Sequence, residues 1–413
     1  MIHTRVRAVD IVIACVLGSA AFGLGGWYYR IPQVTASASF YQETMGPAVM
    51  LACGHGLAAT DTLAVPELDA FLTRRVDAFD CSAVASGPNG GELTALQAAS
   101  RYLMTAVGLA WRISGVSWSG LWWFFGALFG VVAVMAYAAA RLLLSRTAAA
   151  TVAVMMMTSS MQLGALPHLR DYSKAPFFSA MVLMTLLVIM RPLSARALLL
   201  IAVIAGAVMG IAFGVRFDMT LFLAIFVGAV VLASQGALRE TWRKRLAAAA
   251  ASAAAFVIFA LPILLSFQLG NNSWHVIILG FAEPHQTALG LSPTPYSLGT
   301  LYNDSWVSAT VNSAWQRTHG TTALIPLNTP AYGEAAGAYF RSVVRQFPAD
   351  MVTRAWAAAL KIFQLPFEGS VALAPATPTD TWIGRVLVAR AVALVWLEWA
   401  ACLLYTSDAA DEG

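Results

Sequence analysis

Apolar residues along this chain are grouped in runs about as long as a membrane-crossing helix, and short stretches with charged residues separate the runs. A helix needs about 20 mostly apolar residues to cross the hydrocarbon core of a bilayer. The runs cover residues 11–29, 118–140, 147–166, 175–190, 197–214, 219–234 and 246–267, and a further one begins near Val386. This pattern predicts an all-α polytopic membrane protein with about eight transmembrane helices.

One further apolar stretch, Arg101–Ser114, has only 14 residues and contains Arg101 and Arg112. A short amphipathic helix with cations is typical of a segment that lies in the membrane interface. We therefore predict that this segment does not cross the bilayer. Counting it as a crossing would invert the sidedness of everything that follows.

The cationic residues of the short turns predict which way the helices run. With the N-terminus in the cytoplasm, ten cations lie on the inner side and three on the outer side, as the positive-inside rule expects. The inner ones are Arg5, Arg7, Arg141, Arg146, Arg191, Arg196, Arg239, Arg243, Lys244 and Arg245; the outer ones are Arg170, Lys174 and Arg216. No cleavage site of the Ala-x-Ala type closely follows the first run, which favours a membrane anchor over a signal peptide.

Composition supports the same class. Charged residues make up 11% of the chain and hydrophobic residues 59%, whereas soluble domains carry about 25% charged residues. The lysines and arginines are scattered between apolar runs, so the net charge of +4 does not indicate a nucleic-acid partner. We expect a multi-pass protein of a bacterial inner (cytoplasmic) membrane, with the lipid bilayer as its main partner.

Two long segments, 30–117 and 268–385, fall on the predicted outer face. The first belongs with the transmembrane core, residues 1–270. The second is too long for a structureless connection and is predicted to form a small folded unit. Cys53 and Cys81 both lie in the first segment, where an oxidising periplasm would allow a disulfide between them.

The C-terminal tail, residues 402–413, is set apart from the rest. Residues 402–412 resemble the in-frame translation of an adapter used to prepare sequencing libraries. Segments of this kind are excluded from fold arguments. The resemblance implies a truncated metagenomic fragment in which residues 386–401 begin a transmembrane helix that continues past Ala401.

Polar residues that could carry chemistry gather at three places on the predicted outer face. Shortly after the first apolar run stands Glu43, with His55 and Asp61 downstream. Glu43 could act as a general base or a metal ligand, or it could be a solvated carboxylate at the start of a helix.

The second place is the turn between two apolar runs, which holds His168, Arg170, Asp171 and Lys174. Arginine and lysine can bind a phosphate, and the aspartate could orient an arginine, bind a metal or act as a base. An interfacial rim of snorkelling cations is the alternative.

The third place is the turn with Arg216 and Asp218. The two side chains could neutralise each other, or Arg216 could join Arg170 and Lys174 in one phosphate pocket.

These residues resemble the GT-C superfamily of membrane glycosyltransferases. Glu43, the interfacial segment Arg101–Ser114 and Asp171 match its layout in order and sidedness, and the turns Arg-Asp-Tyr-x-Lys-Ala-Pro-Phe and Gly-x-Arg-x-Asp resemble segments of uncharacterised bacterial members. The resemblance implies inverting transfer of a sugar from a polyprenyl-phosphate donor to an acceptor on the outer face, in the cell envelope. Glu43 or Asp171 would then be the base, and Arg170, Lys174 and Arg216 would stabilise the leaving phosphate.

Other readings of the chain stay open at this point. A transporter or flippase, or a non-catalytic envelope-assembly protein, would also be polytopic. Charges are nearly absent from the interiors of the apolar runs, whereas transporters often place polar groups at mid-membrane. The residues leave open whether a divalent metal ion takes part as a cofactor, and they indicate no other cofactor.

Overall fold

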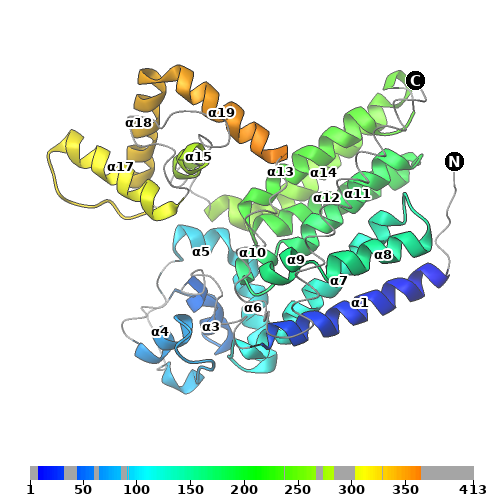
Figure 1. Ribbon diagram of the computed structural model, residues 1–413, viewed down its shortest axis with the longest axis horizontal. Helices are drawn as coiled ribbons and strands as arrows, with labels where there is room; N and C mark the ends of the chain where they lie inside the picture. The colour runs from blue at the N-terminus through cyan, green and yellow to red at the C-terminus, as the bar shows by residue number, and fades with distance from the viewer. Residues whose placement is uncertain are drawn as a thin grey trace. The chain divides into compact units, whose positions relative to one another are not determined.

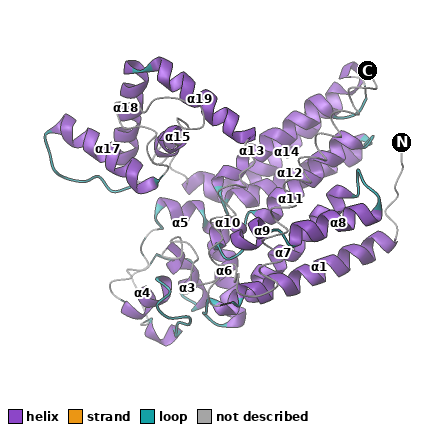
Figure 2. Cartoon of the chain, viewed as in Figure 1, coloured by secondary structure: helices purple, strands orange, loops and turns teal. Residues whose placement is uncertain are grey.

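The computed structural model describes residues 8–31, 44–59, 65–84, 91, 93–236, 238–266, 273–282, 303–327 and 329–363. Within these ranges the chain is helical, with two isolated β-bridges and no strand (Figure 2). The chain divides into two compact units, one formed by Met1–Ser266 with Gly369–Gly413 and the other by Phe267–Glu368.

Long apolar helices lie side by side in the first unit (Figure 1). In the part of the chain that the structure describes, five segments are long and apolar enough to cross a membrane. They are Ala8–Tyr29 (α1), Ser119–Ala140 (η3, Ser119–Leu121, and α7, Trp122–Ala140), Leu169–Met190 (α10, Leu169–Tyr172, and α11, Ala175–Met190), Ala195–Phe213 (α12) and Thr241–Ser266, within α14 (Leu238–Ser266). The first unit therefore has the architecture of an all-helical membrane protein.

The predicted crossing at 147–166 is not one continuous helix. It is divided into α8 (Arg146–Met157) and α9 (Ser160–Ala165). The break falls at three successive hydroxyl residues, and the hydroxyl of Thr158 donates to the carbonyl of Val154 at 2.8 Å. Such side chains compete with the backbone for hydrogen bonds and weaken a helix.

The predicted crossing at 219–234 is short and irregular. It consists of η4 (Phe217–Met219), α13 (Thr220–Gly228) and a π-helical turn, η5 (Ala229–Ala233). The count of about eight crossings therefore stays a prediction, and the run that begins near Val386 lies outside the described residues.

Close helix contacts reveal the chain directions. A Cβ atom on Gly18 would meet Val134 and one on Gly26 would meet Trp122, so α1 and α7 run antiparallel. Further along, Gly206 faces Ser252 and Gly210 faces Phe256, so α12 and α14 run parallel. The predicted alternation of inward and outward crossings requires these directions.

The segment that follows α1 folds into short helices. They are α3 (Gly46–Ala52), α4 (Pro66–Leu72), η2 (Cys81–Ala83), α5 (Ala95–Ala99) and α6 (Arg101–Ser114). Their core is aromatic, because Trp118 stacks on Phe71 and both contact Trp111. A disulfide joins Cys53, which follows α3, to Cys81 in η2.

Helix α6 lies along one end of the long helices. The amides of its second and third residues, Tyr102 and Leu103, donate to the carbonyl of Gly214 at the end of α12. Near its other end, Trp111 donates through Nε1 to the carbonyl of Ser117, just before α7. Both attachments are on the predicted outer side, which is the placement expected of an interfacial helix.

We expect the disulfide to stabilise this segment substantially. Closing a loop over a separation of 28 residues restricts the unfolded chain by about 3–4 kcal/mol. The double variant Cys53→Ala/Cys81→Ala should therefore unfold at a lower temperature in detergent, measured by intrinsic fluorescence. Cys15→Ala, which removes an exposed free thiol in α1, is the matched control. Equal melting temperatures for all three proteins would contradict the prediction.

The second unit contains four described helices, α15 (Ser273–Ala282), α17 (Asp304–His319), α18 (Pro330–Gln346) and α19 (Pro348–Phe363). Apolar side chains such as Ile278, Val311 and Tyr332 form its core. The buried imidazole of His275 links three helices, because Nδ1 is 2.7 Å from the hydroxyl of Tyr332 and Nε2 is 3.1 Å from the carboxylate of Asp304.

Candidate functional site

Four charged residues from two predicted outer turns meet in one ion-pair network. Arg216 pairs with Asp171 through Nη1 and with Asp218 through Nη2, the latter at 3.0 Å. Lys174 Nζ is 3.5 Å from the same Asp218 carboxylate. The network thus joins the start of α11 to the turn between α12 and α13, positions 45 residues apart in the chain.

The local structure explains how these side chains converge. Helix α12 ends at Phe213, with Gly214 as its C-cap, and Arg216 precedes the 3-10 turn η4 that leads into α13. Asp171 belongs to the single turn of α10, and Lys174 occupies the N-cap position of α11. Both turns lie at the same end of the helices, where Gly214 also accepts the hydrogen bonds from α6.

The network is open to solvent on its acidic side. The side chains of Asp171 and Asp218 are 41% and 42% exposed, whereas that of Arg216 is 20% exposed. Burial alone would raise the pKa of Asp218, but the charges of Arg216 and Lys174 hold it below its usual range. Two cations therefore face two carboxylates, and a bound anion would compete with the carboxylates for the same cations.

Two other predicted residues of this turn are less accessible. Arg170 is 9% exposed and therefore buried. Burial lowers the pKa of His168; the charge of Asp171 opposes this shift and that of Arg74 adds to it. His168 is therefore mainly neutral at pH 7 and can accept a hydrogen bond.

Arg74 is a residue that the sequence did not single out. It follows α4 in the first loop and has a left-handed backbone with φ of 59°, a conformation that costs free energy in a non-glycine residue. Its guanidinium lies 4.7 Å from the ring centroid of Trp118. A left-handed arginine has no sequence signature, because this position usually holds glycine or asparagine.

Of the residues predicted after the first apolar run, the structure describes His55 alone. Glu43 and Asp61 lie outside the described residues. His55 is exposed in the turn after α3, where its amide donates to the carbonyl of Met50. Among the described residues, no group of three His, Cys, Asp or Glu side chains is placed to hold a metal ion.

Comparisons with known proteins give this chain no relatives: no protein-family model, no curated protein and no solved structure matches it. Its function must therefore be argued from the site itself. Chemically, the network offers a planar guanidinium and an ammonium group side by side, which suits an anionic ligand such as a phosphate.

Proposed function

We propose that this protein is a glycosyltransferase that moves a sugar from a polyprenyl-phosphate donor to an acceptor on the periplasmic face of a bacterial inner membrane. The observation that carries the proposal is the meeting of Arg216 and Lys174 at one end of apolar helices. A lipid-linked phosphate presents its charge at this depth while its hydrocarbon chain stays in the bilayer. The resemblance to GT-C enzymes points to the same chemistry.

The sidedness of the site also supports the proposal. The turns with Lys174 and Arg216 are at the opposite end of α11 and α12 from Arg191 and Arg196. The positive-inside rule assigns the end with Arg191 and Arg196 to the cytoplasm. The disulfide between Cys53 and Cys81 fits an oxidising compartment for the first loop.

The geometry suggests separate roles for the charged residues. In an inverting transfer, the bond between the anomeric carbon and the phosphate oxygen breaks while the acceptor hydroxyl forms a new bond to that carbon and gives its proton to a base. Arg216 and Lys174 would stabilise the charge that grows on the leaving polyprenyl phosphate. One oxygen of Asp171 already accepts from Arg216, so Asp171 serves best as an orienting group, and Glu43 is the better candidate for the base.

Native mass spectrometry of the purified protein tests the donor site. We expect added polyprenyl phosphate to bind the wild type and to bind Lys174→Ala about tenfold more weakly, since a charged partner contributes about 1.5–3 kcal/mol. Arg101→Ala removes an exposed cation from α6 at the same end of the helices and is the matched control. It should bind the lipid as the wild type does.

Two outcomes would contradict the proposal. Equal binding by the wild type and Lys174→Ala would show that the network does not hold the phosphate. No detectable binding of polyprenyl phosphate by the wild type, at concentrations where other lipids are retained, would favour a transporter or an assembly protein.

A further inference from the structure

A large cavity lies between α1, α7 and α11, away from the Arg216 network. Its volume is about 930 Å³, near the upper end of the range of about 300–1,000 Å³ that is usual for small-molecule sites. Small or apolar side chains form most of its wall, among them Ala14, Gly18, Gly130, Val134, Leu183 and Leu187. A hydrocarbon chain would be a chemically matched occupant of this part of the cavity.

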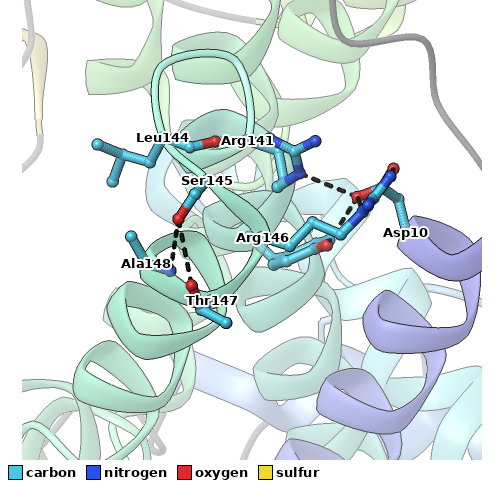
Figure 3. Close-up of polar contacts among 8 residues, drawn as sticks. Asp10, Arg141, Leu144, Ser145, Arg146, Thr147 and Ala148 are labelled. Atoms are coloured by element: carbon cyan, nitrogen blue, oxygen red, sulfur yellow. Dashed lines mark hydrogen bonds and ion pairs between the residues drawn. The ribbon is translucent and has the colours of Figure 1, made fainter.

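A charged cluster lies at one end of the cavity. Asp10, in the first turn of α1, accepts hydrogen bonds from Arg141 Nε at 2.9 Å, from Arg146 Nε at 3.0 Å and from the hydroxyl of Tyr137 at 3.1 Å. Figure 3 shows the two guanidinium groups converging on this one carboxylate. Arg191, at the C-terminal end of α11, lines the same cavity.

Two arginines of this cluster share one carboxylate. Arg141 and Arg146 both pair with the carboxylate of Asp10, and Arg141 and Arg191 line the cavity. The side chains of Asp10 and Arg141 are only 10% and 11% exposed. Basic pockets between membrane helices bind anionic lipid head groups.

We propose that this cavity binds an anionic phospholipid. The phosphodiester lies against Arg141 and Arg191, and an acyl chain occupies the apolar cavity between α1, α7 and α11. Arg191 and Lys174 are at opposite ends of α11, which rises about 24 Å over its 16 residues. The lipid site is therefore separate from the proposed donor site, and its existence does not depend on the proposed function.

Lipid titration of the full chain in a zwitterionic detergent tests the head-group part of the proposal. Native mass spectrometry compares dioleoyl-phosphatidylglycerol with dioleoyl-phosphatidylcholine, which have identical chains. We expect preferential binding of phosphatidylglycerol and about fivefold weaker binding in Arg191→Gln, the loss expected for one cation near an anionic lipid surface. Arg196→Gln, an exposed arginine that does not line the cavity, is the control and should bind as the wild type does.

A second variant tests the apolar part. Val131 lines the cavity and is 42% exposed, so Val131→Trp fills the space without entering the packed core. We expect it to weaken binding of phosphatidylglycerol at least as much as Arg191→Gln does. Leu200→Trp, at an exposed position on α12 outside the cavity, should have no effect.

Three results would overturn the proposal. Equal binding of the two phospholipids by the wild type would show that the cluster does not select the head group. Unchanged binding of phosphatidylglycerol in both Arg191→Gln and Val131→Trp would place the lipid elsewhere. The third result is that polyprenyl phosphate binds the wild type but not Val131→Trp, and that phosphatidylglycerol does not compete with it. That result would assign the cavity to another lipid.

Discussion

Replacing Gly206 by alanine is expected to destabilise the packing of α12 on α14 by about 3 kcal/mol or more, at the upper end of the usual cost of overpacking. A Cβ atom at this position would clash with the carbonyl oxygen of Ser252 and would lie 2.9 Å from the Cβ of Ala255. The carbonyl belongs to the backbone of α14, so it cannot rotate away as a side chain would. The two helices must separate, and dispersion contacts along their whole interface are lost.

The same substitution at another glycine provides a control with the opposite sign. A Cβ atom on Gly228, in α13, meets nothing within 4 Å. Alanine favours a helix over glycine by up to about 1 kcal/mol, so Gly228→Ala should be neutral or stabilising. Thermal unfolding in detergent, followed by fluorescence, measures both variants. A Gly206→Ala protein as stable as Gly228→Ala would show that the close approach of α12 and α14 is not required.

Long apolar runs with charged boundaries were the most predictable part of the fold. Five of the predicted crossings coincide with helices long enough to span a membrane, because hydropathy alone decides whether such a segment can be exposed to lipid. The break between α8 and α9 was not predicted. The hydropathy averaged over residues 147–166 is high despite the three hydroxyl residues at 158–160. Their effect on the helix is local, so an average over the whole run does not detect it.

Pairings between distant charges were harder to predict from the sequence. The phosphate pocket of Arg170, Lys174 and Arg216 stays a prediction, although Lys174 and Arg216 both pair with Asp218. The pairing of Arg216 with Asp171 connects turns that no local pattern relates. Asp10 was missed altogether, because a single acidic residue at the start of an apolar run is ordinary. Its significance comes from Arg141 and Arg146, more than 130 residues away.

Arg216→Ala is expected to lower turnover by about 10²–10³-fold, the usual loss when one preorganised group that stabilises transition-state charge is removed. This prediction rests on the proposed function, and the measurement is release of polyprenyl phosphate from a polyprenyl-phosphate sugar. Arg216→Lys should fall between alanine and the wild type, because it keeps the charge but loses the planar fork that reaches both Asp171 and Asp218.

The exposure of the network allows this effect to be separated from simple unfolding. Asp171 and Asp218 are both about two-fifths exposed, and ion pairs open to water contribute about 0–1 kcal/mol to stability. Arg216→Ala should therefore fold and melt nearly as the wild type does while its turnover falls. A parallel loss of melting temperature and turnover would instead make Arg216 a structural clamp between α10 and η4. Unchanged turnover in a folded Arg216→Ala protein would remove the network from the reaction and would leave Glu43 as the candidate catalytic residue.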